Sequence, residues 1–201
     1  GSLLIIVSTA AVSAALLART YDDLKQDLFT SSTSLGQTLA HTLFPALLHD
    51  DLWRAFEIIR APLQAQATHN PMEADVIFII DAQQKILAST DPKMLPTLGD
   101  LGADDGEFRQ LAHALAKAAS APASRVYELE GAGHYYTATP IAQEGRQLGL
   151  LIVSHARHKL WSRFFEMTAR SAAMGALVLA VILPINWYWG RRTAEPLVAL
   201  S

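Results

Sequence analysis

The residues of this sequence that are best suited to bind a small molecule are five polar and aromatic side chains: Arg125, Tyr127, Tyr135, Thr137 and Thr139. Tyrosine and threonine combine an apolar body with a hydrogen-bonding tip, and the arginine adds one cation. Small-molecule pockets are lined in this way, by an apolar surface with a few polar groups. The set predicts a site for a small anionic or carbonyl-bearing ligand.

Their spacing predicts that a β-hairpin brings these residues together. Residues 125–130 and 134–141 alternate as strands do, and residues 131–133 separate them as a turn. A three-residue turn sets Leu129 opposite Tyr135 and places all five candidates on one face. We expect the other face to be solvated, because it carries two glutamates: Val126, Glu128, Glu130, His134, Tyr136 and Ala138.

A second interpretation of this hairpin stays open. The candidate face can also be a half-polar sheet surface that packs beneath a loop or a partner subunit. Because side chains alternate along a strand, a slip of one residue in the pairing would exchange the two faces. The predicted pocket therefore depends on the register of the hairpin.

The sequence contains no convincing catalytic or metal-binding constellation. It has no glycine-rich phosphate loop and no nucleophile elbow. It has no cysteine, which excludes disulfides, thiolate metal sites and cysteine-attached haem. His155 and His158 are close enough to share a helical face, but arginine and lysine flank them instead of acidic partners. We predict no cofactor and no metal, while a pH-sensing role for histidine stays open.

The elements that must position the candidate residues are helical first and strand-rich later. Helical spacing extends over residues 19–65, where Pro45 interrupts it and Asp50 and Asp51 are expected to cap a second helix. Strand-like runs follow within residues 74–155, with one helix around residues 108–118 between them. An exit helix is expected over residues 156–169. Short connections between consecutive strands predict an antiparallel sheet and an α+β fold.

The first predicted helix carries a narrow apolar stripe: Tyr21, Leu24, Leu28, Leu35, Leu39 and Leu43. Such a stripe is typical of a seam between two helices, or of a helix that lies on its own domain. We interpret the helix as a stalk and predict a homodimer through the stalk and the membrane helices.

The ends of the chain are apolar. The whole chain is 51% hydrophobic and 17% charged, whereas soluble domains carry about 25% charged residues. Its net charge of −3 does not favour nucleic acid as a partner. Residues 1–18 predict a first transmembrane helix, truncated at its N-terminus, with Gly1 and Ser2 as the remnant of a tag. A signal peptide is the alternative.

A second transmembrane helix is predicted over residues 170–190, which lack charge between Arg170 and Arg191. Aromatic residues 187–189 and the Arg191-Arg192 pair follow it, so the positive-inside rule places residues 191–201 in the cytoplasm. Residues 19–169 would then be extracytoplasmic. Pro184 is a candidate bending point for signal transmission.

Residues 75–92, DVIFIIDAQQKILASTDP, resemble the strand pair of extracytoplasmic PAS-like sensor domains of the single Cache type. That family usually has glycine where this chain has Gln84. Residues 48–59 resemble the helix that precedes the strand pair. Residues 191–201 resemble the start of a HAMP domain, with Pro196, Leu197 and Leu200 in a Pro-Leu-x-x-Leu pattern.

The resemblance implies a PAS-like, antiparallel five-stranded sheet between two membrane helices, with the sensor domain in the periplasm of a bacterial inner membrane. Membrane lipid and a second copy of the chain are the implied partners. Receptors of this kind are most often two-component sensor histidine kinases, whose catalysis lies outside such a fragment. A diguanylate cyclase, a phosphodiesterase or a chemoreceptor with the same sensor is an alternative. A ligand-free module that responds to a partner protein or to the membrane is another.

Overall fold

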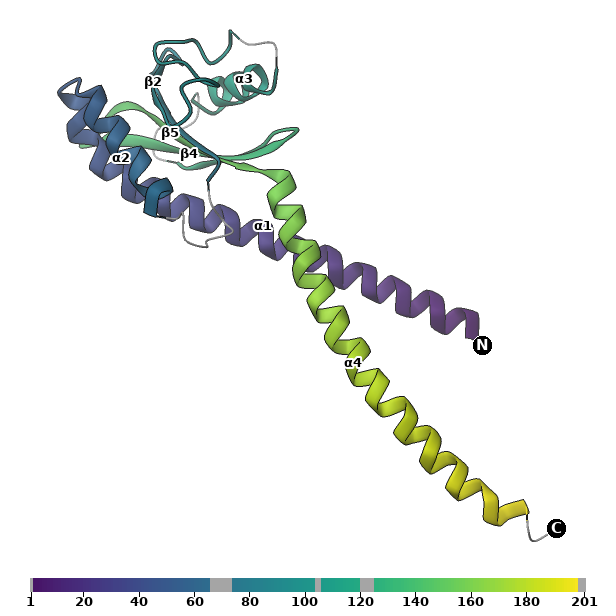
Figure 1. The fold of residues 1–201 in the computed structure, drawn as a ribbon. Coiled ribbons are helices and arrows are strands. Elements are labelled where there is room, and N and C mark those ends of the chain that lie inside the picture. The colour runs from purple at the N-terminus through teal and green to yellow at the C-terminus, as the bar shows by residue number, and fades with distance from the viewer. Residues whose placement is uncertain (1, 66–73, 104–105, 120–124, 199–201) are drawn as a thin grey trace. The chain divides into compact units, whose positions relative to one another are not determined.

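The structure, a computed structural model, describes residues 2–65, 74–103, 106–119 and 125–198 (Figure 1). Its elements are α1 (Ser2–Leu48), α2 (Leu52–Ala65), β1 (Val76–Ile80), β2 (Ile86–Ser89), α3 (Glu107–Ala119), β3 (Tyr127–Glu130), β4 (His134–Gln143), β5 (Arg146–Ala156) and α4 (Arg157–Val198). The chain divides into two compact units, Gly1–Leu160 and Trp161–Ser201. The first unit contains the sheet.

The five strands form one antiparallel sheet in the order β2-β1-β5-β4-β3. This confirms the predicted α+β class and the five-stranded sheet. The long strand β5 lies in the centre and pairs with both β1 and β4. Each pair of strands that is consecutive in the chain, except β2 and β3, is therefore adjacent in the sheet, as short connections favour.

Helices cover both faces of the sheet, and the alternation of side chains along β1 divides the core between them. Ile77 and Ile79 face α1 and α2, whereas Phe78 and Ile80 face α3 and the loop before it. All four side chains are fully buried. Burial of a large aliphatic or aromatic side chain contributes about 1.5–3 kcal/mol, so both layers stabilise the sheet.

The apolar stripe of α1 packs on the domain of its own chain. Leu24, Leu28, Leu39 and Leu43 are buried within the first unit, and α1 packs on β4, β5 and α2. Of the two interpretations of the stripe, the helix that lies on its own domain is therefore the one observed. The buried leucines cannot also form a seam between two copies, so a homodimer would have to use other residues.

Two details at the end of α1 bear on the predicted helix boundaries. The sequence predicts an interruption of the helix at Pro45. In the structure α1 continues through Pro45 and ends at Leu48. Proline removes one intrahelical hydrogen bond, and the buried Ala46 and Leu47 hold the next turn against the core. The predicted cap of α2 is confirmed for Asp51, whose carboxylate accepts a hydrogen bond from the backbone N–H of Arg54 at 3.0 Å.

The second unit consists of the helical residues of α4 from Trp161 onward. The helix continues through Pro184, whose side chain is exposed. Pro196 and Leu197 lie in the helical backbone, but their side chains, like Leu200 as a whole, lie outside the described part. No helix among the described residues has a stretch that is long and apolar enough to cross a membrane.

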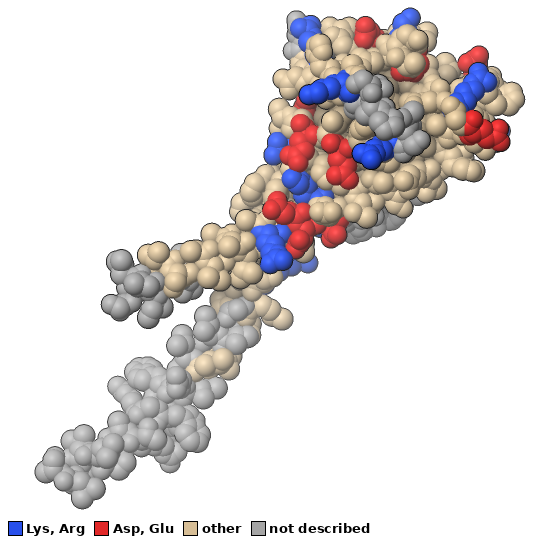
Figure 2. All heavy atoms as spheres, turned by 180° about the vertical axis from the view of Figure 1, so that it is seen from behind, with Lys and Arg blue, Asp and Glu red and all other residues tan. Residues whose placement is uncertain are grey.

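Charged side chains of both signs are interspersed on the face of the molecule shown in Figure 2. The N-terminal part of α1 differs from this surface, because it has no charged residue before Arg19. The charged residues of α1 thus all lie from Arg19 onward.

Candidate functional site

The β3–β4 hairpin forms, but its register differs by one residue from the predicted one. Leu129 pairs with Tyr136 instead of Tyr135. The backbone N–H of Gly131 donates to the His134 carbonyl at 2.8 Å, so the hairpin closes around a two-residue loop and not a three-residue turn. A slip of one residue exchanges the faces of one strand relative to the other.

The five predicted ligand-binding residues consequently do not share a surface. Tyr135, Thr137 and Thr139 face α1 and are buried, whereas Tyr127 packs on the α3 side of the sheet. Arg125 precedes β3 and is exposed. The prediction that one face of the hairpin carries all five residues is therefore wrong, because the observed register places them on different sides of the sheet.

The residues of the face that was expected to be solvated are divided between the two sides of the sheet. Tyr136 and Ala138 are 1% and 0% exposed and belong to the core beneath α3. The two glutamates lie on the opposite side, where Glu130 accepts a hydrogen bond from the Lys25 ammonium of α1 at 2.9 Å. That bond is the main cause that raises the pKa of Lys25.

The contact between α1 and the sheet is partly polar. The Tyr21 and Tyr135 hydroxyls are 2.9 Å apart. Burial, and then the hydrogen bond to Tyr135, raises the pKa of Tyr21 to about 12. Ser32 Oγ lies 2.6 Å from Nε2 of the buried His155. These bonds connect α1 to β4 and β5 at points where aliphatic packing is interrupted.

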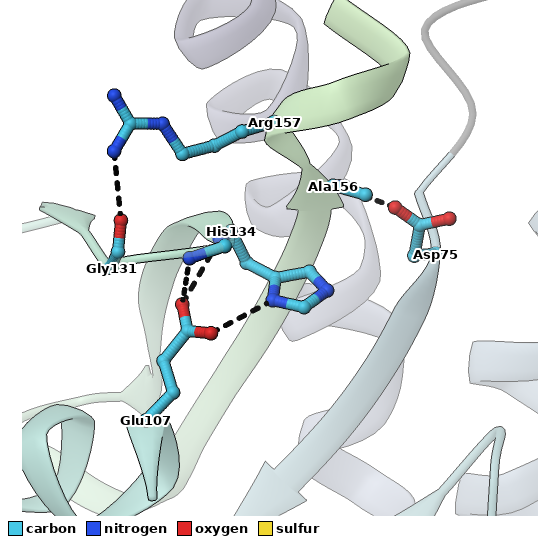
Figure 3. A network of polar contacts seen from close by, with 7 residues as sticks. Asp75, Glu107, Gly131, His134, Ala156 and Arg157 are labelled. Carbon is cyan, nitrogen blue, oxygen red and sulfur yellow. Dashed lines mark hydrogen bonds and ion pairs between the residues drawn. The ribbon is translucent and has the colours of Figure 1, made fainter.

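A carboxylate at the start of α3 belongs to a network of polar contacts around the β3–β4 loop (Figure 3). Glu107, the first residue of α3, accepts hydrogen bonds from the backbone N–H groups of Gly133 at 3.1 Å and His134 at 3.0 Å. Its other oxygen lies 3.2 Å from His134 Nδ1. We call this contact the Glu107 latch, because it ties the start of α3 to the loop between β3 and β4.

The environment of the latch favours a charged carboxylate. Burial alone would raise the pKa of Glu107, but the hydrogen bonds from His134 and from the backbone outweigh it, and the pKa is lowered. The Tyr136 hydroxyl is buried and has no hydrogen-bond partner among the described residues. Burial, followed by the nearby charge of Glu107, raises the pKa of Tyr136.

The same loop holds the junction between β5 and α4. The carbonyl of Gly131 accepts a hydrogen bond from the Arg157 guanidinium at 3.2 Å. The carbonyl of Gly133 accepts one from the Arg157 backbone N–H at 2.9 Å. The Arg157 guanidinium also lies over the Tyr135 ring, 5.1 Å from its centroid. Three interactions thus fix the first residue of α4.

Asp75 holds this junction from the other side. Its carboxylate accepts hydrogen bonds from the backbone N–H of Ala156 and from the ammonium of Lys159. Because β5 ends at Ala156 and α4 begins at Arg157, no loop separates strand from helix. A displacement of β5 or of the β3–β4 loop would therefore act directly on α4.

These contacts form a continuous path from α3 to α4 through the β3–β4 loop. Figure 3 shows the contacts of Glu107, Arg157 and Asp75 in this region. The path runs from Glu107 through Gly133 to Arg157, and Asp75 completes the clamp. Sequence reasoning missed Glu107, Arg157 and the role of Asp75. The glycine-rich loop was a signal that backbone N–H groups were available, but a partner 26 residues away leaves no local pattern.

Three cavities lined by described residues adjoin α3. One of about 590 Å³ lies beside its C-terminal half, and one of about 320 Å³ lies between β2 and the loop 94–103. A third, of about 70 Å³, lies between α3 and the β3–β4 hairpin and is lined by Glu107 and Tyr136. No group of three metal-ligating side chains occurs in the described residues.

No family model and no curated protein matches the chain. Solved structures do. The sensor domain of the histidine kinase DctB from V. cholerae is 12% identical with a TM-score of 0.50, and the match covers 76% of this chain and 58% of that chain. The extracellular domain assigned to the histidine kinase vpHK1S-Z8 is 13% identical with a TM-score of 0.55, covering 79% and 63%.

At these identities the likeness concerns the fold alone. The mixed architecture, with a long N-terminal helix on an antiparallel five-stranded sheet, is that of PAS-like and Cache-like sensor domains. The chain spans 58% and 63% of the length of these two matched chains.

Proposed function

We propose that the chain is the extracytoplasmic sensing region of a two-pass transmembrane receptor, and that α4 carries the signal out of the domain. The observation that carries this proposal is the direct continuation of β5 into α4, clamped by the Glu107 latch and Asp75. The shared fold with sensor domains of histidine kinases supports it.

The two-pass topology rests on the sequence. Residues 3–18 and 171–190 are uncharged, and an arginine pair follows the second stretch. In this proposal residues 19–169 lie in the periplasm, and residues 170–190 lead to a HAMP module that begins near residue 191. Pro184, Pro196, Leu197 and Leu200 would belong to the segment that transmits the signal.

Cysteine labelling on whole cells tests the topology. A cysteine at the exposed Gln83 should react with a membrane-impermeant maleimide, whereas a cysteine at position 201 should react only after permeabilisation. Equal labelling of both positions in intact cells would contradict the proposed orientation.

Hydrogen exchange tests the coupling. Glu107→Ala should increase amide exchange in the β3–β4 loop and in residues 157–160, because the latch no longer holds the loop against α4. The β1–β2 hairpin should be unaffected. Glu128→Ala is a matched control, because it removes an exposed carboxylate from the same hairpin. Unchanged exchange in residues 157–160 would refute the coupling path.

The output that we propose is a two-component histidine kinase, on the basis of the kinase sensor domains that share the fold. Membranes that contain the whole protein should then incorporate phosphate from ATP onto histidine. Synthesis of a cyclic dinucleotide, or methylation without phosphorylation, would instead favour the cyclase or the chemoreceptor alternative.

A homodimer is part of this proposal, with its contact moved from the leucine stripe to the outward face of α1. Thr30, Ser34 and Gln37 are exposed there, whereas Leu28 is 3% exposed. Cysteines at the exposed positions should form cross-links between subunits in membranes, and a cysteine at position 28 should not. Absence of cross-links along the whole outward face would count against a stalk dimer.

A further inference from the structure

The largest cavity described above lies where β1 ends and β5 begins, beside the C-terminal half of α3. Its volume of about 590 Å³ is in the range of small-molecule sites. Its walls combine an apolar floor with polar groups at the rim: Ile80, Leu115 and Leu150 below, and Asp81, Gln83 and Gln147 above.

A strained residue shapes this cavity. Gln84, which lines it, has a φ of 63°, a conformation that glycine adopts without cost and that other residues adopt rarely. The Gln84 side chain donates a hydrogen bond to the Ala112 carbonyl of α3 at 2.8 Å. Its own carbonyl accepts one from the Leu101 N–H at 3.1 Å. An amide side chain at this position thus ties the β1–β2 turn to α3 and fixes one wall.

Another part of the lining depends on a missing side chain. A Cβ on Gly149 would overlap the carbonyl oxygen of Ile80. Gly149 therefore lets β5 approach the end of β1 closely, and the cavity is built on a rigid pair of strands. A strained residue such as Gln84 in the wall of a cavity is an indication of function.

The charge of the lining selects the ligand. Asp81 is the one charged side chain among the described lining residues, and no lysine, arginine or histidine lines the cavity. One Asp81 oxygen accepts the backbone N–H groups of Gln83 and Lys85, both at 2.8 Å. Its second oxygen has no partner among the described residues and is available to a hydrogen-bond donor.

We propose that this cavity binds a small organic amine, with the ammonium group at Asp81, the carbon chain on the apolar floor, and the amides of Gln83 and Gln147 beside the ammonium. A charge-assisted hydrogen bond to a carboxylate is about twice as strong as a neutral one. Carboxylates and phosphates would meet only repulsion from Asp81. The inference rests on the proposed sensing function. Binding here would shift α3 through Leu115, and the shift would change the hydrogen bonds of the Glu107 latch.

Butylamine and butyrate are matched probes, since they share a carbon chain and differ in the sign of their charge. In a ligand-observed NMR titration of the 201-residue chain in detergent, butylamine should bind and butyrate should not. Asp81→Asn keeps a side-chain carbonyl that can form the turn, and it should lower the affinity for butylamine at least about tenfold. Glu128→Gln, which removes a distant carboxylate, should leave the affinity unchanged.

Two further variants cover the case in which Asp81→Asn unfolds. Gln147→Glu adds a second carboxylate at an exposed position of the cavity rim and should raise the affinity for butylamine several-fold. Gln84→Gly relieves the backbone strain and removes the tie to α3, so it should fold and bind more weakly. Binding of butyrate at least as tight as butylamine, or no binding of butylamine, would overturn the proposal.

The outcomes separate this inference from the proposed function. If butylamine binds but Glu107→Ala leaves the hydrogen exchange of residues 157–160 unchanged, the proposed amine site is supported and the proposed coupling to α4 is contradicted. If the exchange responds and butylamine does not bind, the coupling stands and the ligand class is wrong.

Discussion

Gly131→Ala is the sharpest perturbation of the Glu107 latch, because it leaves every charge in place. A Cβ at this position would overlap Glu107 Oε1 and lie 2.9 Å from Cε2 of the Tyr136 ring. Gly131 is not among the described residues with positive φ, so alanine adds no backbone strain. The flexible glutamate must therefore move, and its hydrogen bonds to Gly133 and His134 must break.

The expected cost follows from those bonds. A hydrogen bond to a charged group contributes about 1.5–3 kcal/mol, but the released carboxylate, already 20% exposed, regains water. We expect a net loss of about 2–3 kcal/mol of unfolding free energy, not the sum over all bonds. For a domain of this size that corresponds to a decrease in Tm of roughly 5–10 °C.

Thermal unfolding of a double-mutant cycle is the assay. Gly131→Ala should lower the unfolding free energy by about the expected amount in the wild-type background. In a Glu107→Ala background it should lower the unfolding free energy only slightly, because the carboxylate that the new Cβ displaces is then absent. Gly106→Ala is the matched control. A Cβ there meets nothing within 4 Å, so its effect should stay within about 0.5 kcal/mol.

Equal costs of Gly131→Ala in the two backgrounds would refute the reasoning. The substitution would then act through the Tyr136 ring or the backbone, and the latch would not stabilise the loop. A cost for Gly106→Ala similar to that for Gly131→Ala would also refute it, because the effect would then come from any alanine near the start of α3.

Three further predictions concern pH and the contact between α1 and the sheet. Because folding lowers the pKa of Glu107 from 4.5, this residue contributes its full stabilisation above that value and loses it as the pH falls through the folded pKa. In acid titrations of unfolding, the stabilities of wild type and Glu107→Gln should therefore converge as the pH falls below 4.5. Thr139→Val removes a buried hydroxyl without a partner among the described residues and should raise the unfolding free energy by about 1 kcal/mol in denaturant melts, whereas Thr38→Val, at an exposed position, should not. Gly36→Ala should destabilise, although alanine in a helix interior normally gains about 1 kcal/mol over glycine, because its Cβ would overlap Thr139 Oγ1; a higher Tm would contradict the close approach of α1 to β4.

Elements with a clear local period could be predicted from the sequence, and the structure has them. The strand at Val76–Ile80 is an apolar run bounded by turn residues, and α3 has apolar side chains at helical spacing. The exception is the end of α1, where Pro45 does not stop the helix. Local propensity there is outweighed by burial of the following turn, which depends on residues more than 25 positions away in the sheet.

The candidate site was less accessible to sequence reasoning, and the β3–β4 hairpin shows why. The sequence allows a two-residue or a three-residue loop after Glu130, and the two differ by one residue in register. The choice is coupled to Glu107, whose carboxylate holds the loop N–H groups. No property of residues 125–141 alone contains that information.

By itself, the sequence determined the class of fold and the order of helices and strands, because period and turn chemistry are local. Only the tertiary structure decided that the leucine stripe of α1 packs on its own sheet and that Tyr135, Thr137 and Thr139 lie beneath that helix. The same holds for the path from Glu107 to Arg157. Each depends on contacts between distant segments, and such contacts form only when the whole core packs.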